Sequence, residues 1–339
     1  MSTGWMIAVL ICLFLILSQG ADLLVTNVKK IADHWKIDIF ILGLILGLLT
    51  SVPEIILASN AVRQGLGELS LGNLLGGTII LLGLVLGVSI IVNRQIRTDG
   101  HVWKVLPGML LFTLPLLLGL KGSLNRWDGL VIILAYAAMV AYDYWHTHRT
   151  SLLKLRKLPK LVEATTVEKD SFVDWWGKKQ RFWRPWRWLV NPQLWRAVCG
   201  FILVVVSANL IMTLAEKILV TFNLSEVFLG AVIFAVGTNL PEIVVAFRSF
   251  LCQVGELSIS HIMGSAIGNI LVVGVLLQFT SFKTGPTLIF VITALTIILL
   301  AALFLLFYRT DRRFSRWEGL VLLGVYLSYL GAQIIWGVN

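Results

Sequence analysis

Apolar residues fill long stretches of the chain, and short polar segments separate them. About ten such stretches are present, at residues 4–27, 38–62, 68–92, 103–120, 127–145, 197–219, 226–250, 257–280, 286–307 and 317–336. An α-helix needs about 20 mostly apolar residues to cross the hydrocarbon core of a bilayer, and these stretches are close to that length. The pattern predicts an all-α integral membrane protein with about ten transmembrane helices, the first retained rather than cleaved as a signal peptide.

The composition agrees with this pattern. Of the 339 residues, 58% are hydrophobic and only 14% are charged. A soluble domain of this size needs more charge to cover its surface, so a cytosolic enzyme, a disordered chain and a secreted disulfide scaffold are all excluded. Cys12, Cys199 and Cys252 lie in apolar stretches without metal-ligand or CxxC spacing. We therefore interpret them as small buried hydrophobic residues rather than as ligands or redox groups.

The net charge of +10 is concentrated in one segment, residues 146–196, which joins two apolar stretches. Tryptophan and arginine alternate there, as in Phe182-Trp183-Arg184-Pro185-Trp186-Arg187-Trp188. Such a mixture suits the headgroup layer of a membrane, where aromatic rings lie at the interface and cations approach anionic lipids. Since no nucleic-acid-binding motif is present, we interpret the segment as a cytoplasmic, partly interfacial loop that contacts lipid and not nucleic acid.

The distribution of lysine and arginine among the short loops predicts the orientation. Basic residues are frequent in the loops that face inward when the N-terminus lies outside, and they are sparse in the others. The positive-inside rule therefore places both termini outside. The compact chain, without a large regulatory domain, fits a multi-pass protein of a prokaryotic plasma (inner) membrane.

The chain also contains an internal duplication. Thr50-Ser51-Val52-Pro53-Glu54 matches Thr238-Asn239-Leu240-Pro241-Glu242, 188 positions later, and Arg126-Trp127-Asp128-Gly129 matches Arg316-Trp317-Glu318-Gly319. Residues 1–145 form a first repeat of five helices, 146–196 the basic loop, and 197–339 a second repeat of five helices. Because five is odd, the second repeat enters the membrane in the opposite sense. Inverted repeats are typical of secondary transporters, whose site lies near the midplane where the halves meet.

Candidate chemistry lies at matched positions of the two repeats. Glu54 and Glu242 fall near the middle of apolar stretches, where a carboxylate is costly unless a cation or water meets it. The proline before each one removes a backbone donor, so we expect loosened carbonyls in the preceding turn, including those of Gly47 and Ala235. Thr50 and Thr238 precede the glutamates by four residues and share a helix face with them.

The third and eighth predicted helices contribute unequally. Ser265 and Asn269 share a helix face and add two oxygen atoms, whereas the matching Gly77 and Leu81 add no side-chain oxygen. Hydroxyl, carboxylate and carbonyl oxygens suit Ca²⁺, Na⁺ or Mg²⁺ rather than Zn²⁺ or Cu⁺. Two carboxylates balance one divalent cation, and Na⁺ ions or protons could occupy the same place in turn, as an exchanger requires.

These residues resemble the repeats of the cation/Ca²⁺ exchanger superfamily, whose members are sodium/calcium exchanger-like membrane proteins. The resemblance rests on Gly20 to Val25, Thr50 to Glu54, Leu71 to Gly76, Gly237 to Glu242 and Gly264-Ser265. It implies ten helices, a central site on helices 2, 3, 7 and 8, and Ca²⁺ moved against Na⁺ or H⁺ without a cofactor. It also implies that the first and sixth helices slide across the other eight.

The resemblance further implies which residues bind the cation. Glu54 and Glu242 would be the main carboxylate ligands, and hydroxyl or carbonyl ligands would come from Thr50, Ser51 and Thr238, with Ser265 and Asn269 as partners from the eighth helix. This chain departs from the family at five positions. Leu49 replaces Gly, Asn239 and Gly77 each replace Ser, and Leu81 replaces Asn or Asp. His261 stands where the second repeat often has Asn or Asp. We count Asn239 among the cation-binding residues and Gly77 as a point of close approach.

Three functions remain open at this point. The first is an antiporter that exchanges Ca²⁺ for Na⁺ or H⁺, with inorganic cations as its only small partners. The second is an exchanger of another cation, or a monovalent cation/H⁺ antiporter on the same scaffold, which Leu81 favours. The third is a membrane sensor that no longer transports. An enzyme is not expected, because no Ser/His/Asp set, HExxH motif or phosphate-binding loop is present. The sequence predicts no oligomeric state.

Overall fold

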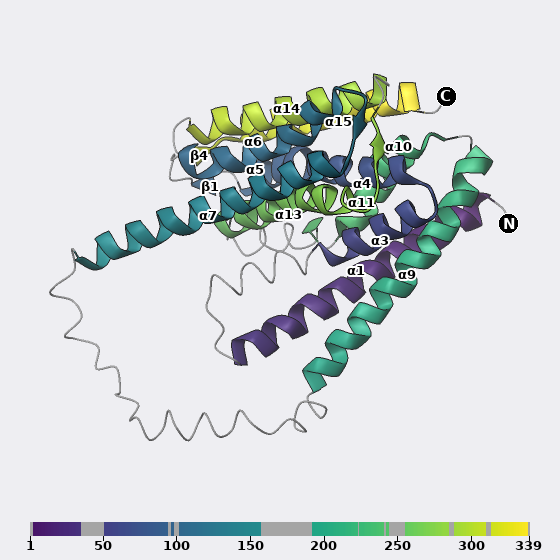
Figure 1. The fold of residues 1–339 in the computed structure, drawn as a ribbon, viewed down its shortest axis with the longest axis horizontal. Helices are drawn as coiled ribbons and strands as arrows, with labels where there is room; N and C mark the ends of the chain where they lie inside the picture. Colours follow the sequence, from purple (N-terminus) through teal and green to yellow (C-terminus); the bar gives the residue numbers. More distant parts are fainter. Residues whose placement is uncertain are drawn as a thin grey trace.

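A computed structural model gives the fold of the chain (Figure 1). It describes residues 3–34, 51–93, 96–97, 102–156, 192–222, 224–240, 242–243, 255–284, 288–309 and 313–337. Thr50, Gly47 and Cys252 lie outside these ranges, as do residues 157–191 of the basic loop.

The helices follow the predicted order. The first repeat contains α1 (Thr3–His34), α3 (Val52–Arg63), α4 (Gly67–Ile79), the π-helical segment η1 (Ile80–Val85), α5 (Leu86–Asn93), α6 (Val102–Gly119) and α7 (Arg126–Arg156). The second contains α9 (Pro192–Phe222), α10 (Glu226–Phe228), the π-helical segment η5 (Leu229–Phe234), α11 (Ala235–Thr238), α13 (Gly255–Leu276), α14 (Leu288–Arg309) and α15 (Arg316–Gly337). In the described part of the chain these elements occupy all ten predicted spans.

Five of the described helices are long and apolar enough to cross a membrane. They contain Gly4–Leu24, Gly67–Val92, Pro192–Phe222, Leu288–Arg309 and Arg316–Trp336. Shorter apolar helices cover Val105–Gly119, Glu226–Thr238 and Ile262–Leu276. The protein is therefore an all-α membrane protein of two inverted five-helix repeats, as the sequence predicts. The prediction that its cysteines are buried is wrong for Cys12 and Cys199, which are exposed, because lipid solvates a small apolar side chain as well as a protein core does.

α1 and α9 lie side by side and cross the rest of the bundle obliquely (Figure 1). Their backbones meet closely at two glycines. A Cβ atom on Gly20 would lie 3.0 Å from the Gly200 carbonyl oxygen, and a Cβ atom on Gly200 would lie 2.7 Å from the Leu24 nitrogen. Small residues at helix interfaces allow this approach in membranes. The outer faces of both helices expose large apolar side chains, as lipid contact requires.

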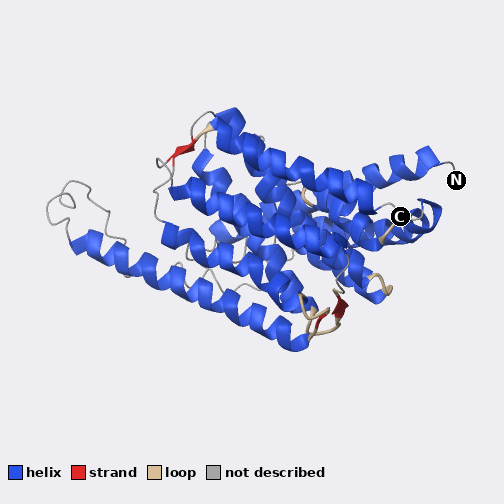
Figure 2. Cartoon of the chain, turned by 90° about the horizontal axis from the view of Figure 1, so that it is seen from above, coloured by secondary structure: helices blue, strands red, loops and turns tan. Residues whose placement is uncertain are grey.

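Two short antiparallel ribbons tie the repeats together. β1 (Ile96–Arg97) pairs with β4 (Arg313–Phe314), and β2 (Ser123–Leu124) pairs with β3 (Phe282–Lys283). In each ribbon one strand comes from the first repeat and the other from the second. The two ribbons lie at opposite ends of the bundle (Figure 2). This arrangement follows from the inverted repeat, because the same loop pairing recurs on both sides.

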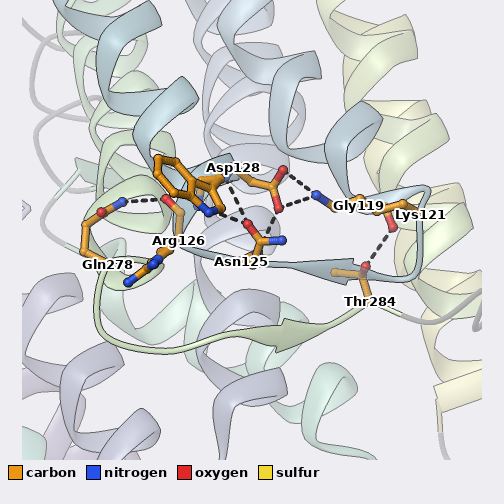
Figure 3. A network of polar contacts seen from close by, with 8 residues as sticks. Gly119, Lys121, Asn125, Arg126, Asp128, Gln278 and Thr284 are labelled. Atoms are coloured by element: carbon orange, nitrogen blue, oxygen red, sulfur yellow. Dashed lines mark hydrogen bonds and ion pairs between the residues drawn. The ribbon is translucent and has the colours of Figure 1, made fainter.

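The matching Arg-Trp-Asp-Gly and Arg-Trp-Glu-Gly segments begin α7 and α15. Asp128 accepts a hydrogen bond from the Asn125 backbone nitrogen at 2.8 Å and pairs with Lys121, while the Asn125 side chain accepts from the Trp127 nitrogen (Figure 3). Glu318 likewise accepts from the Ser315 nitrogen at 2.6 Å. Both acids cap the helix that contains them, which satisfies donors otherwise left unpaired at a helix start.

Candidate functional site

The first glutamate lies in the first turn of a helix. Ser51 has φ −86° and ψ 4°, and α3 begins at Val52 with Pro53 in its first turn. We expected Pro53 inside a continuous helix, and this expectation is wrong. Proline is tolerated in a first turn because the amide it lacks has no partner there. The result is a helix that begins beside Glu54, with the positive end of its dipole at that point.

The second repeat has a similar backbone conformation at the matching residue. α11 ends at Thr238, and Asn239 has φ −89° and ψ 13°, close to the values of Ser51. Glu242 follows in a described helical segment, while Pro241 lies outside the described residues. Two residues related by the duplication thus share one non-helical conformation, each three residues before a glutamate.

Backbone contacts without intervening side chains bring the two repeats together at the centre. A Cβ atom on Gly76 would lie 2.6 Å from the Ala231 Cα atom, and one on Gly72 would lie 2.7 Å from the Val227 carbonyl oxygen. α4 therefore lies directly on α10 and η5. This proximity allows the Thr238 hydroxyl to donate to Asn73 Oδ1 across the interface at 3.2 Å.

The two carboxyl groups meet in this central region. Glu54 and Glu242 are each only 3% exposed, and they lie close enough to repel each other when both are ionised. Oε2 of each has no hydrogen-bond partner among the described residues. A buried carboxylate oxygen without a partner is unfavourable unless a proton, water or cation meets it.

Helices α4 and α13 complete the walls of the site. A Cβ atom on Gly77 would lie 2.8 Å from both Asn239 Nδ2 and Asn269 Nδ2, and one on Gly268 would lie 2.6 Å from Ser51 Oγ. Gly77 and Gly268 thus leave room for polar side chains from neighbouring helices. Ser265 is also buried, and its hydroxyl has no partner among the residues that the structure describes.

The structure brings together most of the predicted site residues. Those it gathers at the interface of the repeats are Glu54, Glu242, Ser51, Thr238, Asn239, Asn269 and Gly77. Ser265 is buried one turn before Asn269 on α13. The Ala235 carbonyl also lies here, but it is not free, because the Asn239 backbone nitrogen and Nδ2 both donate to it. Sequence reasoning did not assign Asn73 to the site. The sequence could have indicated Asn73, because it lies between Gly72 and Gly76 on a helix that was expected to line the site.

A model of a known protein family matches both repeats. The model of the sodium/calcium exchanger protein family matches residues 5–145 and 193–335. The chain belongs to the sodium/calcium exchanger family.

Relatives and a solved structure extend along nearly the whole chain. The putative antiporter CaxA of Alkalimonas amylolytica is 28% identical over 328 residues, covering 93% of this chain and 94% of CaxA. The sodium/calcium exchanger MaX1 of Methanosarcina acetivorans is 22% identical over 345 residues, covering 97% and 98%. The structure of the sodium-calcium exchanger NCX_Mj superposes with a TM-score of 0.60 at 22% identity and covers 96% of this chain and 97% of its own.

Membership of the sodium/calcium exchanger family decides whether the protein is a transporter or an enzyme. The family and its structural neighbours are membrane exchangers, so the protein is a cation transporter and not an enzyme. The duplicated Thr-x-x-Pro-Glu segments lie within the two matched ranges.

Proposed function

We propose that the protein is a secondary antiporter that exchanges Ca²⁺ for Na⁺, or for H⁺, at a site built on Glu54 and Glu242. The observation that carries the proposal is the pair of buried carboxyl groups, one from each inverted repeat, each with an oxygen that lacks a partner among the described residues. Ionised together, they neutralise one divalent cation. A hydroxyl from Ser51 or Ser265 supplies further oxygen ligands of the kind Ca²⁺ prefers.

The packing of α1 and α9 supports alternating access. Phe14 of α1 packs edge-on against Phe234, with ring centroids 5.5 Å apart, and a Cβ atom on Gly237 would overlap the Phe14 ring. One end of the site is thus covered by a side chain of α1. Movement of α1 together with α9 uncovers the site without disturbing the helices that hold the ligands.

The membrane setting is part of the proposal. We place the protein in a prokaryotic inner membrane with both termini outside and residues 146–196 in the cytoplasm, because the basic residues gather on that side. Alternating Trp and Arg in this segment favour contact with anionic headgroups.

Flux in proteoliposomes tests the transport proposal. Purified protein is reconstituted into vesicles loaded with Na⁺, with acidic buffer, or with neither gradient, and uptake of radioactive Ca²⁺ is followed. We expect one outward gradient to drive uptake and thereby to identify the counter-ion. If neither gradient moves Ca²⁺, the proposal is wrong.

Substitution of the glutamates tests the site. Glu54→Gln and Glu242→Gln each remove one negative charge while keeping the size of the side chain, so we expect both to reduce driven uptake to the level of empty vesicles. Glu216→Gln, on an exposed position of α9, is the matched control and should transport normally. Normal flux in either glutamate variant, with unchanged elution on size exclusion, would refute the two-carboxylate site.

A further inference from the structure

We propose that the site holds its cation together with at least one water molecule, and that it therefore accepts small, strongly hydrated divalent cations such as Mg²⁺ and Mn²⁺ alongside Ca²⁺. The inference rests on the proposed function, because it concerns the same two carboxylates. It is carried by the wall formed by α4, where hydrogen-bond donors stand in place of oxygen ligands.

The α4 wall presents no side-chain oxygen at Gly77. This residue has no side chain, and the two amide nitrogens of Asn239 and Asn269 lie over it. Leu81, one turn later in η1, is fully buried and carries only carbon atoms. A cation between the glutamates therefore lacks direct side-chain ligands from these two residues.

The amide groups at this wall differ in their hydrogen bonds. Asn239 Nδ2 donates to the Ala235 carbonyl at 2.8 Å and lies 3.3 Å from the Thr238 hydroxyl, so its two hydrogens are used. Asn269 Nδ2 and Asn73 Nδ2 are buried and lack a partner within the described ranges of the chain. These two donors require an acceptor, because an unpaired buried N–H group is unfavourable.

A cation cannot satisfy an N–H group, but a water molecule bound to the cation can. The water oxygen has two lone pairs, so it can bind the cation with one and accept the amide hydrogen with the other. The unpaired donors of Asn269 and Asn73 thus favour a cation that keeps part of its hydration shell. The unpaired acceptors, Glu54 Oε2 and Glu242 Oε2, bind the same cation directly or through water.

The common divalent cations differ in how readily they give up their bound water. Ca²⁺ takes about six to eight oxygen ligands and gives up its water readily, whereas Mg²⁺ keeps several waters and is usually held by one or two carboxylates. A site that supplies two carboxylates and donors for retained water does not demand complete dehydration. It therefore discriminates poorly against the smaller ions.

Competition with Ca²⁺ flux in the wild-type protein is the first test. Radioactive Ca²⁺ uptake into reconstituted vesicles is measured against rising external Mg²⁺, Mn²⁺ or unlabelled Ca²⁺. We expect the concentrations of Mg²⁺ and Mn²⁺ that halve the uptake to lie within an order of magnitude of that for unlabelled Ca²⁺. Ca²⁺ uptake that persists unchanged in a large excess of both ions would overturn the inference and leave Ca²⁺ antiport intact.

A double variant tests the residues responsible. Gly77→Ser with Asn239→Ser puts a hydroxyl on α4 and removes the amide that occupies its place, which replaces donors with oxygen ligands. We expect the concentration of Mg²⁺ that halves the uptake, divided by that of unlabelled Ca²⁺, to rise roughly tenfold. Gly324→Ser, on an open position of α15, is the control that should match the wild type.

A spectroscopic measurement tests the retained water directly, whatever the outcome of the flux assays. Mn²⁺ bound to the purified protein in D₂O should show deuterium modulation from directly bound water in pulsed electron paramagnetic resonance, and Glu54→Gln should abolish Mn²⁺ binding. Bound Mn²⁺ without coordinated water would show that the amides donate to the carboxylates instead, and the inference would be wrong. Hydrated Mn²⁺ in a protein that moves no Ca²⁺ would sustain the inference and refute Ca²⁺ antiport.

Discussion

At the scale of single residues, Gly76 sets how closely the two repeats approach each other. A Cβ atom on Gly76 would overlap the backbone of Ala231, which cannot rotate away as a side chain can. We therefore expect Gly76→Ala to destabilise the protein by at least about 1–3 kcal/mol, as other overpacked interiors are destabilised. Gly324→Ala is the matched control, because a Cβ atom there meets nothing within 4 Å. Thermal unfolding in detergent compares the two, and equal melting temperatures would contradict this role of Gly76.

The residue scale also shows where sequence reasoning ends. Glu54 and Glu242 could be predicted because a carboxylate in an apolar stretch is costly and occurs twice at one spacing. The hydrogen bond that Asn73 Oδ1 accepts from Thr238 and the one that the Ala235 carbonyl accepts from Asn239 could not be predicted. Both depend on side-chain directions across a helix interface, and a one-dimensional pattern contains no information about these directions.

At the scale of helices, α1 and α9 differ from the others in what they touch. Phe14 of α1 is buried against Phe234, whereas α9 exposes a row of large apolar side chains that includes Phe201. The ten spans were predictable from their length, but the non-helical conformations of Ser51 and Asn239 were not, because one residue of altered φ and ψ leaves the apolar pattern unchanged.

Engineered disulfides test the proposed movement of these helices. Asn60 Nδ2 of α3 donates to Asn209 Oδ1 of α9 at 2.7 Å, so Asn60→Cys with Asn209→Cys should join the moving and static parts and block flux until the bond is reduced. Asn60→Cys and Asn209→Cys alone are the matched controls, and each should leave flux intact under the same oxidation. All variants are placed in a chain whose native cysteines are replaced by alanine. Full activity of the oxidised α3–α9 pair would exclude sliding of α9 past α3.

For the whole molecule, the predicted orientation can be measured at the two ribbons. Ser123 in β2 and Ser315 beside β4 are both exposed and lie at opposite ends of the bundle (Figure 2). With the termini outside, a membrane-impermeant maleimide should label Ser123→Cys in intact cells and Ser315→Cys only after permeabilisation. The same cysteine-free background serves here, and the opposite labelling pattern would reverse the orientation.

The pairing of β1 with β4 and of β2 with β3 has a consequence for the origin of the chain. Each ribbon joins a loop of one five-helix unit to the other loop of its counterpart, so two identical units inserted in opposite directions would form both ribbons by one symmetry operation. They are the contacts that a two-fold homodimer of such units would make. The units of that homodimer would have to insert into the membrane in both orientations. Within one polypeptide the two units can differ, as Gly77 and Ser265 do at matched positions.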